Sequence, residues 1–251
     1  MLFFDASAGS GFKGACGHGS IALAAAAFEQ GWVKGHEGWN EIRLDVPLGT
    51  VTLAVELVDG RSARVRYYHV PSRLLARDIN LATARGTVLL DLVKAGALVA
   101  FVNLPALREI YAAIRATAQG ARLRHPETQA PVTPELVLFT NDRKQENDEL
   151  RYYVAALFGP DSLDRSPCGT GTSARVAQLI GRGRMDTAGR VTATSIIGSS
   201  FEGRAMGTVD IDGITHVLPV VTGSAHMTGR HEFVRDPADG LAGGFRCGPE
   251  S

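Results

Sequence analysis

The sequence has only three cysteines among its 251 residues, Cys16, Cys168 and Cys247, and no two of them form a CxxC pair. This low, odd number excludes a disulfide-stabilised scaffold and indicates free thiols in a reducing compartment, so we expect a cytoplasmic protein. An excess of charge of one sign is also lacking, because 26 Lys and Arg balance 26 Asp and Glu. Without a net field, neither nucleic acid nor a membrane surface is expected as a partner.

Long hydrophobic runs are lacking as well. The longest apolar run, Ile21 to Phe28, is too short to span a bilayer. Near the start of the chain, Asp5 interrupts the apolar residues 1–4 and no basic region precedes them, so we expect no secretory signal peptide. The chain is nevertheless long enough to bury a substantial core, as one large domain or two small ones.

Two of the cysteines begin the same short phrase, Cys-Gly-x-Gly-[Ser/Thr]-x-Ala. The copies occupy residues 16–22 (CGHGSIA) and 168–174 (CGTGTSA), and a helix-like run follows each. Gly31 and Gly183 both lie fifteen residues beyond their cysteine. Two matched cysteines, each at the start of a helix, predict two half-sites that face one substrate, in an acid/base enzyme that uses two thiols. Cys247 lies in a Gly- and Pro-rich tail without this phrase, and we expect it to be inert.

Local patterns predict short strands around these two helices. Residues 21–30 are apolar on nearly all sides and Gly31 ends the run, so this helix should be enclosed on all sides. Further helices are predicted over about residues 171–181 and, with a Pro near its start, over 105–118. Strands are predicted over residues 51–58, 62–68, 87–92, 98–102, 136–139, 152–158, 204–211 and 214–221, hairpin turns at Asp59-Gly60, Ala95-Gly96 and Asp212-Gly213, and loops over 120–134 and the charged residues 141–149.

The second cysteine motif extends to a longer phrase that resembles a known family. Residues 164–174 (DRSPCGTGTSA) look like the signature of the proline racemase family, which includes the 4-hydroxyproline 2-epimerases, and residues 15–22 resemble that family's first cysteine motif. The resemblance covers most of the chain in order, because it continues at residues 70–72 (VPS), 195–203 (SIIGSSFEG) and 222–229 (TGSAHMTG).

The resemblance implies a mixed α/β (α+β) fold of two similar halves. Each half would be a curved mixed sheet around a central helix, as in diaminopimelate epimerase, with the active site between the halves. We expect the first half over residues 1–98, the second over 99–238, and a tail over 239–251 that returns to the first half. Members of the family usually carry several tens of residues before the first cysteine motif, whereas Met1 lies fifteen residues ahead of Cys16. This departure predicts that the helix over residues 21–28 is exposed.

The chemistry of such an enzyme explains why cysteines begin helices. Removing the Cα hydrogen of an amino acid builds negative charge beside a carboxylate, and the N–H groups at a helix N-terminus stabilise such charge. The same dipole is expected to lower the thiol pKa from ~8.5 toward neutrality, so that one cysteine is a thiolate while the other stays a thiol. The amide donors expected at the two helix ends are Gly17, His18, Gly169 and Thr170.

The family also assigns roles to side chains near the cysteines. The resemblance implies that Asp164 and His18 hold the ring nitrogen of the substrate, with Asp164 neutralising its positive charge. A purely structural role is the alternative for His18, whose side chain would then orient its loop and not bind the substrate. A second departure lies at residues 94–98 (KAGAL), where the family usually has Gly-Gly-x-[Phe/Tyr] near the pocket, and this leaves the substrate open.

Our hypothesis is a cofactor-independent 4-hydroxyproline 2-epimerase, with proline racemase as the alternative. Cysteine at both motif positions disfavours the dehydratase branch, in which the second position is commonly Thr. The rival from another class is an inactive relative that acts as a binding protein. No cofactor or metal is expected, because the glycine motifs lack a βαβ context and His226 and His231 are isolated. The expected partner is a small amino acid, and a homodimer is the candidate assembly.

Overall fold

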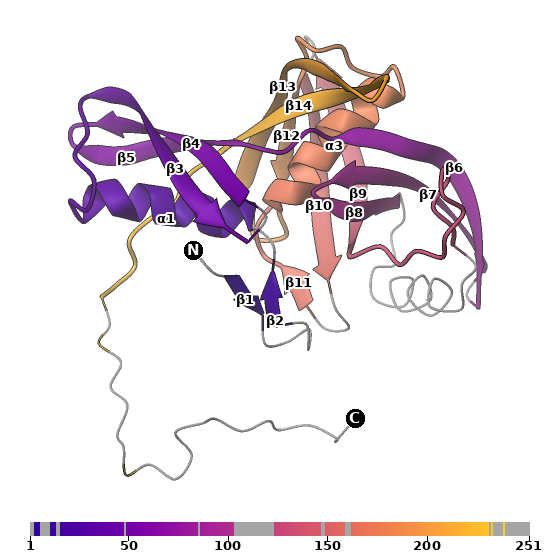
Figure 1. The fold of residues 1–251 in the computed structure, drawn as a ribbon, viewed down its shortest axis with the longest axis horizontal. Helices are drawn as coiled ribbons and strands as arrows, with labels where there is room; N and C mark the ends of the chain where they lie inside the picture. The colour runs from indigo at the N-terminus through magenta and orange to yellow at the C-terminus, as the bar shows by residue number, and fades with distance from the viewer. Residues whose placement is uncertain are drawn as a thin grey trace.

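The computed structural model describes residues 3–5, 11–13, 16–47, 49–84, 86–102, 123–146, 149–158, 162–230, 232 and 238. In this part of the chain a large mixed sheet packs against two α-helices, α1 (Gly17–Glu29) and α3 (Gly169–Gly181) (Figure 1). Neither helix is long and apolar enough to cross a membrane. The helix predicted over residues 105–118, Cys247 and the tail 239–251 lie outside the described residues.

Twelve strands form the large sheet, and a separate pair forms a small one. The small sheet joins β1 (Phe3–Asp5) to β2 (Gly11–Lys13). The order of the large sheet is β3-β4-β5-β14-β13-β12-β10-β9-β8-β7-β6, and β11 pairs with β10. Its strands are β3 (Gly38–Val46), β4 (Gly49–Val58), β5 (Arg61–Tyr68), β6 (Arg73–Thr83), β7 (Gly86–Ala95), β8 (Ala97–Val102), β9 (Leu136–Glu146), β10 (Glu149–Phe158), β11 (Ser162–Asp164), β12 (Arg190–Thr194), β13 (Ser200–Ile211) and β14 (Ile214–Gly223).

The three predicted hairpins are confirmed. Asp59 and Gly60 join β4 to β5 with φ of 51° and 72°, and Asp212 and Gly213 join β13 to β14 with φ of 53° and 75°. Two successive positive φ values match the right-handed twist of the flanking strands, which is why Asp-Gly is favoured there. Gly96, with φ of 69°, turns β7 into β8.

The charged segment at residues 141–149 is largely strand, so the prediction of a loop is wrong there. β9 continues to Glu146 and β10 begins at Glu149, and the two strands pair antiparallel along their length. The charges do not prevent pairing because side chains alternate between the two faces of a strand. Asp142 points to one face, where it contacts Arg175 and Arg184.

The α1 helix is covered mainly on one side. β4 and β5 pack against it, and seven of its residues are buried, whereas Ala22, Leu23 and Ala26 are partly exposed. Two expectations for this helix followed from the sequence. The expectation that it is enclosed on all sides is wrong, and the expectation that it is exposed is met in part. The α3 helix differs, because β6, β7, β8, β12, β13 and β14 all contact it. Ten of its residues are buried, including Arg175 and Gln178.

One strand joins the surroundings of the two helices into a continuous sheet. β14 pairs with β13 beside α3 and with β5 beside α1, through Val221 and Tyr67 among others (Figure 1). Residues 69–72 then lead the chain from β5 to β6, and Ser72 pairs with Val217 of β14 on the way. β6, β7 and β8 thus lie against α3. The division of the chain at residue 98 stays a prediction.

Candidate functional site

The two motif cysteines occupy equivalent positions at the N-termini of α1 and α3. Cys16 is the N-cap residue of α1, and its Sγ accepts a hydrogen bond from the Gly19 amide at 3.3 Å. Cys168 is the N-cap residue of α3, and its Sγ accepts from the Gly171 amide, also at 3.3 Å. A side chain that accepts from the third helical amide is the usual way to satisfy a helix start, here performed by sulfur. The expectation that each cysteine begins a helix is confirmed.

The two helix starts meet at a pair of glycines. A Cβ on Gly17 would lie 3.3 Å from the Gly169 Cα, and a Cβ on Gly169 would lie 3.2 Å from the Gly17 Cα. The structure therefore brings Cys16 and Cys168 together, and Cys16 is close enough for its charge to act on Cys168. Each sulfur also faces a second amide. The Cys16 sulfur faces the His18 amide, and the Cys168 sulfur faces the Thr170 amide.

The backbone of Cys168 is strained, whereas that of Cys16 is extended. Cys168 has φ of 65° and ψ of 110°, while Cys16 has φ of −140° and ψ of 108°. A residue with a side chain rarely adopts a positive φ, and such strain persists only where the surroundings hold it. Here the Ser166 Oγ accepts from the Cys168 amide at 3.1 Å, and Asp164 Oδ1 accepts from the Ser166 amide at 2.8 Å. A short chain of hydrogen bonds thus fixes Cys168 and places Asp164 beside it.

Burial, not the helix dipole, dominates the pKa of both thiols. The pKa of Cys168 is raised to about 12, mainly by burial and also by the Asp164 carboxylate, while the Gly171 and Thr170 amides oppose this. Burial also raises the pKa of Cys16, with the Gly19 amide lowering it and Asp164 raising it. The expectation that the thiol pKa falls toward neutrality is therefore wrong, because desolvation of a thiolate outweighs two amide contacts.

The remaining predicted residues lie around these thiols to different degrees. Gly169 is buried and Thr170 partly exposed in the first turn of α3. His18 is exposed, and its ring lies edge-on to Phe201 of β13, with the ring centroids 6.0 Å apart. Within the described residues, no group of three His, Cys, Asp or Glu could hold a metal ion. Another histidine, His216 of β14, is half-buried near a hairpin turn, and its Nδ1 lies 2.8 Å from the Ile214 carbonyl oxygen.

Sequence reasoning missed several residues that the fold brings to this site. Ser166 supports the strained cysteine, and its place two residues before Cys168 was the available signal. Phe201 packs against His18, although it lies in another part of the chain. Tyr67 packs against Gly17, and Tyr152 lies close enough to Cys168 to be affected by its charge. No local pattern marks these aromatic residues, because their partners are far away in sequence.

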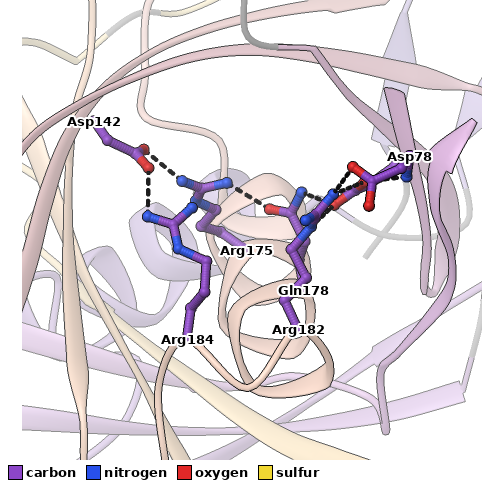
Figure 2. A network of polar contacts seen from close by, with 7 residues as sticks. Asp78, Asp142, Arg175, Gln178, Arg182 and Arg184 are labelled. Carbon is purple, nitrogen blue, oxygen red and sulfur yellow. Dashed lines mark hydrogen bonds and ion pairs between the residues drawn. The ribbon is translucent and has the colours of Figure 1, made fainter. Parts of the chain in front are cut away.

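A partly buried network of polar and charged side chains ties α3 to neighbouring strands (Figure 2). The Asp91 carboxylate of β7 accepts from Arg182 Nε at 2.6 Å and Nη2 at 2.7 Å, and from Gln178 Nε2 at 2.6 Å. Arg175 donates to Gln178 Oε1 at 2.5 Å and also contacts Asp142, which accepts from Arg184 at 3.0 Å. The helix that carries Cys168 is therefore tied to strands on both sides, which fixes the position of its N-terminus.

The family model described as proline racemase matches residues 1–246. The proline racemase of Acetoanaerobium sticklandii is 30% identical over 260 residues, covering 98% of this chain and 76% of the relative. The trans-3-hydroxy-L-proline dehydratase of Azospirillum brasilense is 32% identical over 252 residues, covering 94% of this chain and 74% of the relative. A solved hydroxyproline epimerase from Agrobacterium vitis, with bound trans-4-hydroxy-L-proline, has a TM-score of 0.80 and 28% identity, covering 94% of this chain and 71% of that chain.

Proposed function

The chain belongs to the proline racemase family, and we propose that it is a cofactor-independent epimerase that inverts the Cα of 4-hydroxyproline. The observation that carries this proposal is the pair of thiols on two helix N-termini that touch at Gly17 and Gly169. Inversion at a carbon needs a base on one face and an acid on the other, and two equivalent thiols supply both. Proline racemisation is the alternative activity.

The proposed reaction moves one proton off Cα and another onto it. The Cys16 thiolate takes the Cα proton from one face, and the electron pair of the broken C–H bond moves into the carboxylate to form an enolate-like dianion. The Cys168 thiol gives its proton to the opposite face and becomes the thiolate. In the reverse direction the two cysteines exchange roles. The amides of Gly17, His18, Gly169 and Thr170 are proposed to hold the carboxylate, where losing one such donor costs about 10²–10³ in rate.

Asp164 gives this site a way to couple substrate binding to thiolate formation. Its carboxylate raises the pKa of both Cys16 and Cys168, because a second negative charge nearby opposes ionisation of a thiol. We propose that the cationic ring nitrogen binds Asp164, with His18 beside it. Pairing with that cation cancels the field of the carboxylate at both sulfurs. A thiolate then forms at a lower pH when a substrate is bound than in the free protein.

The proposed substrate is inferred from the relatives, and the proposed reaction is inferred from the geometry of the two cysteines. The Agrobacterium vitis structure, which holds trans-4-hydroxy-L-proline, supports a hydroxylated proline ring. The dehydratase relative shows that sequence similarity alone does not select the reaction. A dehydratase removes the Cα proton but has no need to return one to the opposite face. The matched geometry of Cys16 and Cys168 therefore favours inversion.

Proton NMR in D₂O tests the proposal. The protein is incubated with trans-4-hydroxy-L-proline, L-proline and trans-3-hydroxy-L-proline in turn. Deuterium should enter at Cα together with the 2-epimer of trans-4-hydroxy-L-proline, and Cys16→Ser and Cys168→Ser should each abolish the epimer, while the control Cys247→Ser should not. Loss of water from trans-3-hydroxy-L-proline without inversion would overturn the proposal in favour of a dehydratase. No exchange with any substrate, from folded protein, would indicate an inactive relative that binds a ligand.

A further inference from the structure

Tyr67 presents an unexplained hydroxyl beside the first thiol. It lies in β5 with 1% of its surface exposed, in the apolar cluster that includes Ile21 of α1 and Phe201. Among the described residues its hydroxyl has no hydrogen-bond partner. A phenol hydroxyl can donate one hydrogen bond, so this donor remains available to a group that lies near it. Phe would fill the same space without supplying a donor.

The ring is positioned at the start of α1. A Cβ on Gly17 would lie 3.5 Å from Tyr67 Cε1 and 3.6 Å from Cδ1, and Cε1 is bonded to the carbon that carries the hydroxyl. Cys16 packs against the same apolar cluster, and its charge acts on the Tyr67 hydroxyl. Pairing of Tyr67 with Val221 of β14 fixes the strand at this point. The hydroxyl is thus held close to a sulfur that ionises during the proposed reaction.

We propose that Tyr67 is a positioning residue for Cys16, whose hydroxyl donates a hydrogen bond to Sγ when Cys16 is a thiolate. This inference rests on the proposed function insofar as it gives the Cys16 thiolate a role in turnover. A neutral donor aimed at a charged acceptor makes a stronger hydrogen bond than one between neutral groups. Tyr67 therefore offsets part of the desolvation that opposes ionisation of Cys16.

The charges around Cys16 agree with this role. Burial and the Cys16 charge raise the pKa of Tyr67 to about 12, so the phenol keeps its proton and remains a donor. Asp164 faces Cys16 and opposes its ionisation, and Cys168 lies close enough for the two thiols to interact. The His69 ring lies edge-on to Tyr67, with centroids 5.5 Å apart, and burial lowers its pKa to about 4, so it is neutral. Around neutral pH the His69 ring carries no charge, so it does not compete with Tyr67 as a cationic donor to Cys16.

The test compares Tyr67→Phe with Tyr68→Phe, a control on the same strand whose side chain points to the opposite face. The rate of alkylation by iodoacetamide is measured against pH, and peptide mass spectrometry separates Cys16 from Cys168. Tyr67→Phe should move the midpoint for Cys16 up by about one pH unit, equivalent to a tenfold lower rate on the acid side, since one pKa unit is a tenfold change in the thiolate fraction. Tyr68→Phe should leave it unchanged.

Two further readouts test the inference independently. Replacing Tyr67 by 3-fluorotyrosine, a more acidic donor that keeps the hydroxyl, should move the midpoint down instead. In an active protein, Tyr67→Phe should lower kcat with little change in KM, because the hydrogen bond forms to the thiolate and not to the substrate. An unchanged Cys16 midpoint in folded Tyr67→Phe would overturn the inference. Alkylation requires no turnover, so a protein without epimerase activity would contradict the proposed function and still leave the role of Tyr67 measurable.

Discussion

Gly17 and Gly169 bring the first turns of the two helices into contact, with room between them for hydrogen atoms alone. A methyl group on either glycine would lie 3.2 to 3.3 Å from the Cα of the other. Such a contact is too close for an ordinary Cβ, so the neighbouring backbone would have to move. Each glycine directly follows a cysteine, and their contact therefore sets the separation of the two thiols.

We expect Gly17→Ala to impair catalysis more than stability. The added methyl group pushes the two helix starts apart by a few tenths of an ångström, and misplacing reacting groups by about 1 Å can cost about 10²-fold in rate. The kcat/KM for epimerisation should fall about tenfold or more, while the melting temperature changes by a few degrees. Gly60→Ala is the control, because Gly60 has φ of 72° and nothing within 4 Å. It should lower stability by about 1 kcal/mol and leave kcat unchanged.

Removing the Ser166 hydroxyl should release the strained conformation of Cys168. The Ser166 Oγ accepts from the Cys168 amide, and without it this buried donor has lost its partner. Ser166→Ala should cost about 1–2 kcal/mol in the free energy of unfolding and lower kcat about tenfold. Urea unfolding and steady-state kinetics measure the two effects. A variant with wild-type kcat would show that Cys168 needs no such support.

The raised pKa of Cys168 predicts a loss of stability in alkali. An unfolded thiol loses its proton near its ordinary value of 9.0, whereas burial keeps the folded thiol protonated to about pH 12. Between these values the unfolded state binds fewer protons, so this contribution to stability is complete below about pH 9 and falls as pH rises toward 12, by up to about 1.4 kcal/mol per unit. Urea unfolding of Cys168→Ser between about pH 8 and pH 10.5 should show a shallower decline than that of the wild type. Equal slopes would contradict this.

Asp91 should be the most sensitive residue of the network around α3. Burial alone would raise its pKa, but hydrogen bonds from Arg182 and Gln178 hold the pKa below its ordinary value of 3.8. This contribution is present above that value and lost as pH falls through the folded pKa. Asp91→Asn should cost about 3 kcal/mol at neutral pH, because it leaves Arg182 without its main partner. Glu127→Gln, which removes a surface partner of Arg73, is the control and should change the free energy of unfolding far less than Asp91→Asn does.

The sequence predicted the elements that depend on local chemistry. Both cysteine helices, the Asp-Gly hairpins and most strands follow from residues close together in the chain, such as Asp212 and Gly213, whose conformation needs no distant partner. The duplicated phrase also identified Cys16 and Cys168 as a pair. The charged residues 141–149 were predicted wrongly because pairing with a neighbouring strand outweighed their low strand propensity.

Only the tertiary structure decided the positions and the pKa values of the two cysteines. The contact between Gly17 and Gly169 depends on β14, which joins the surroundings of both helices into one sheet. Burial raises the pKa of both thiols above the values expected from a helix N-terminus, since desolvation arises from every residue packed around a group, whatever its place in the chain. The same packing places Tyr67 beside Cys16. The sequence thus determined which groups are proposed to carry the chemistry, and the fold determined their distances, their pKa values and their neighbours.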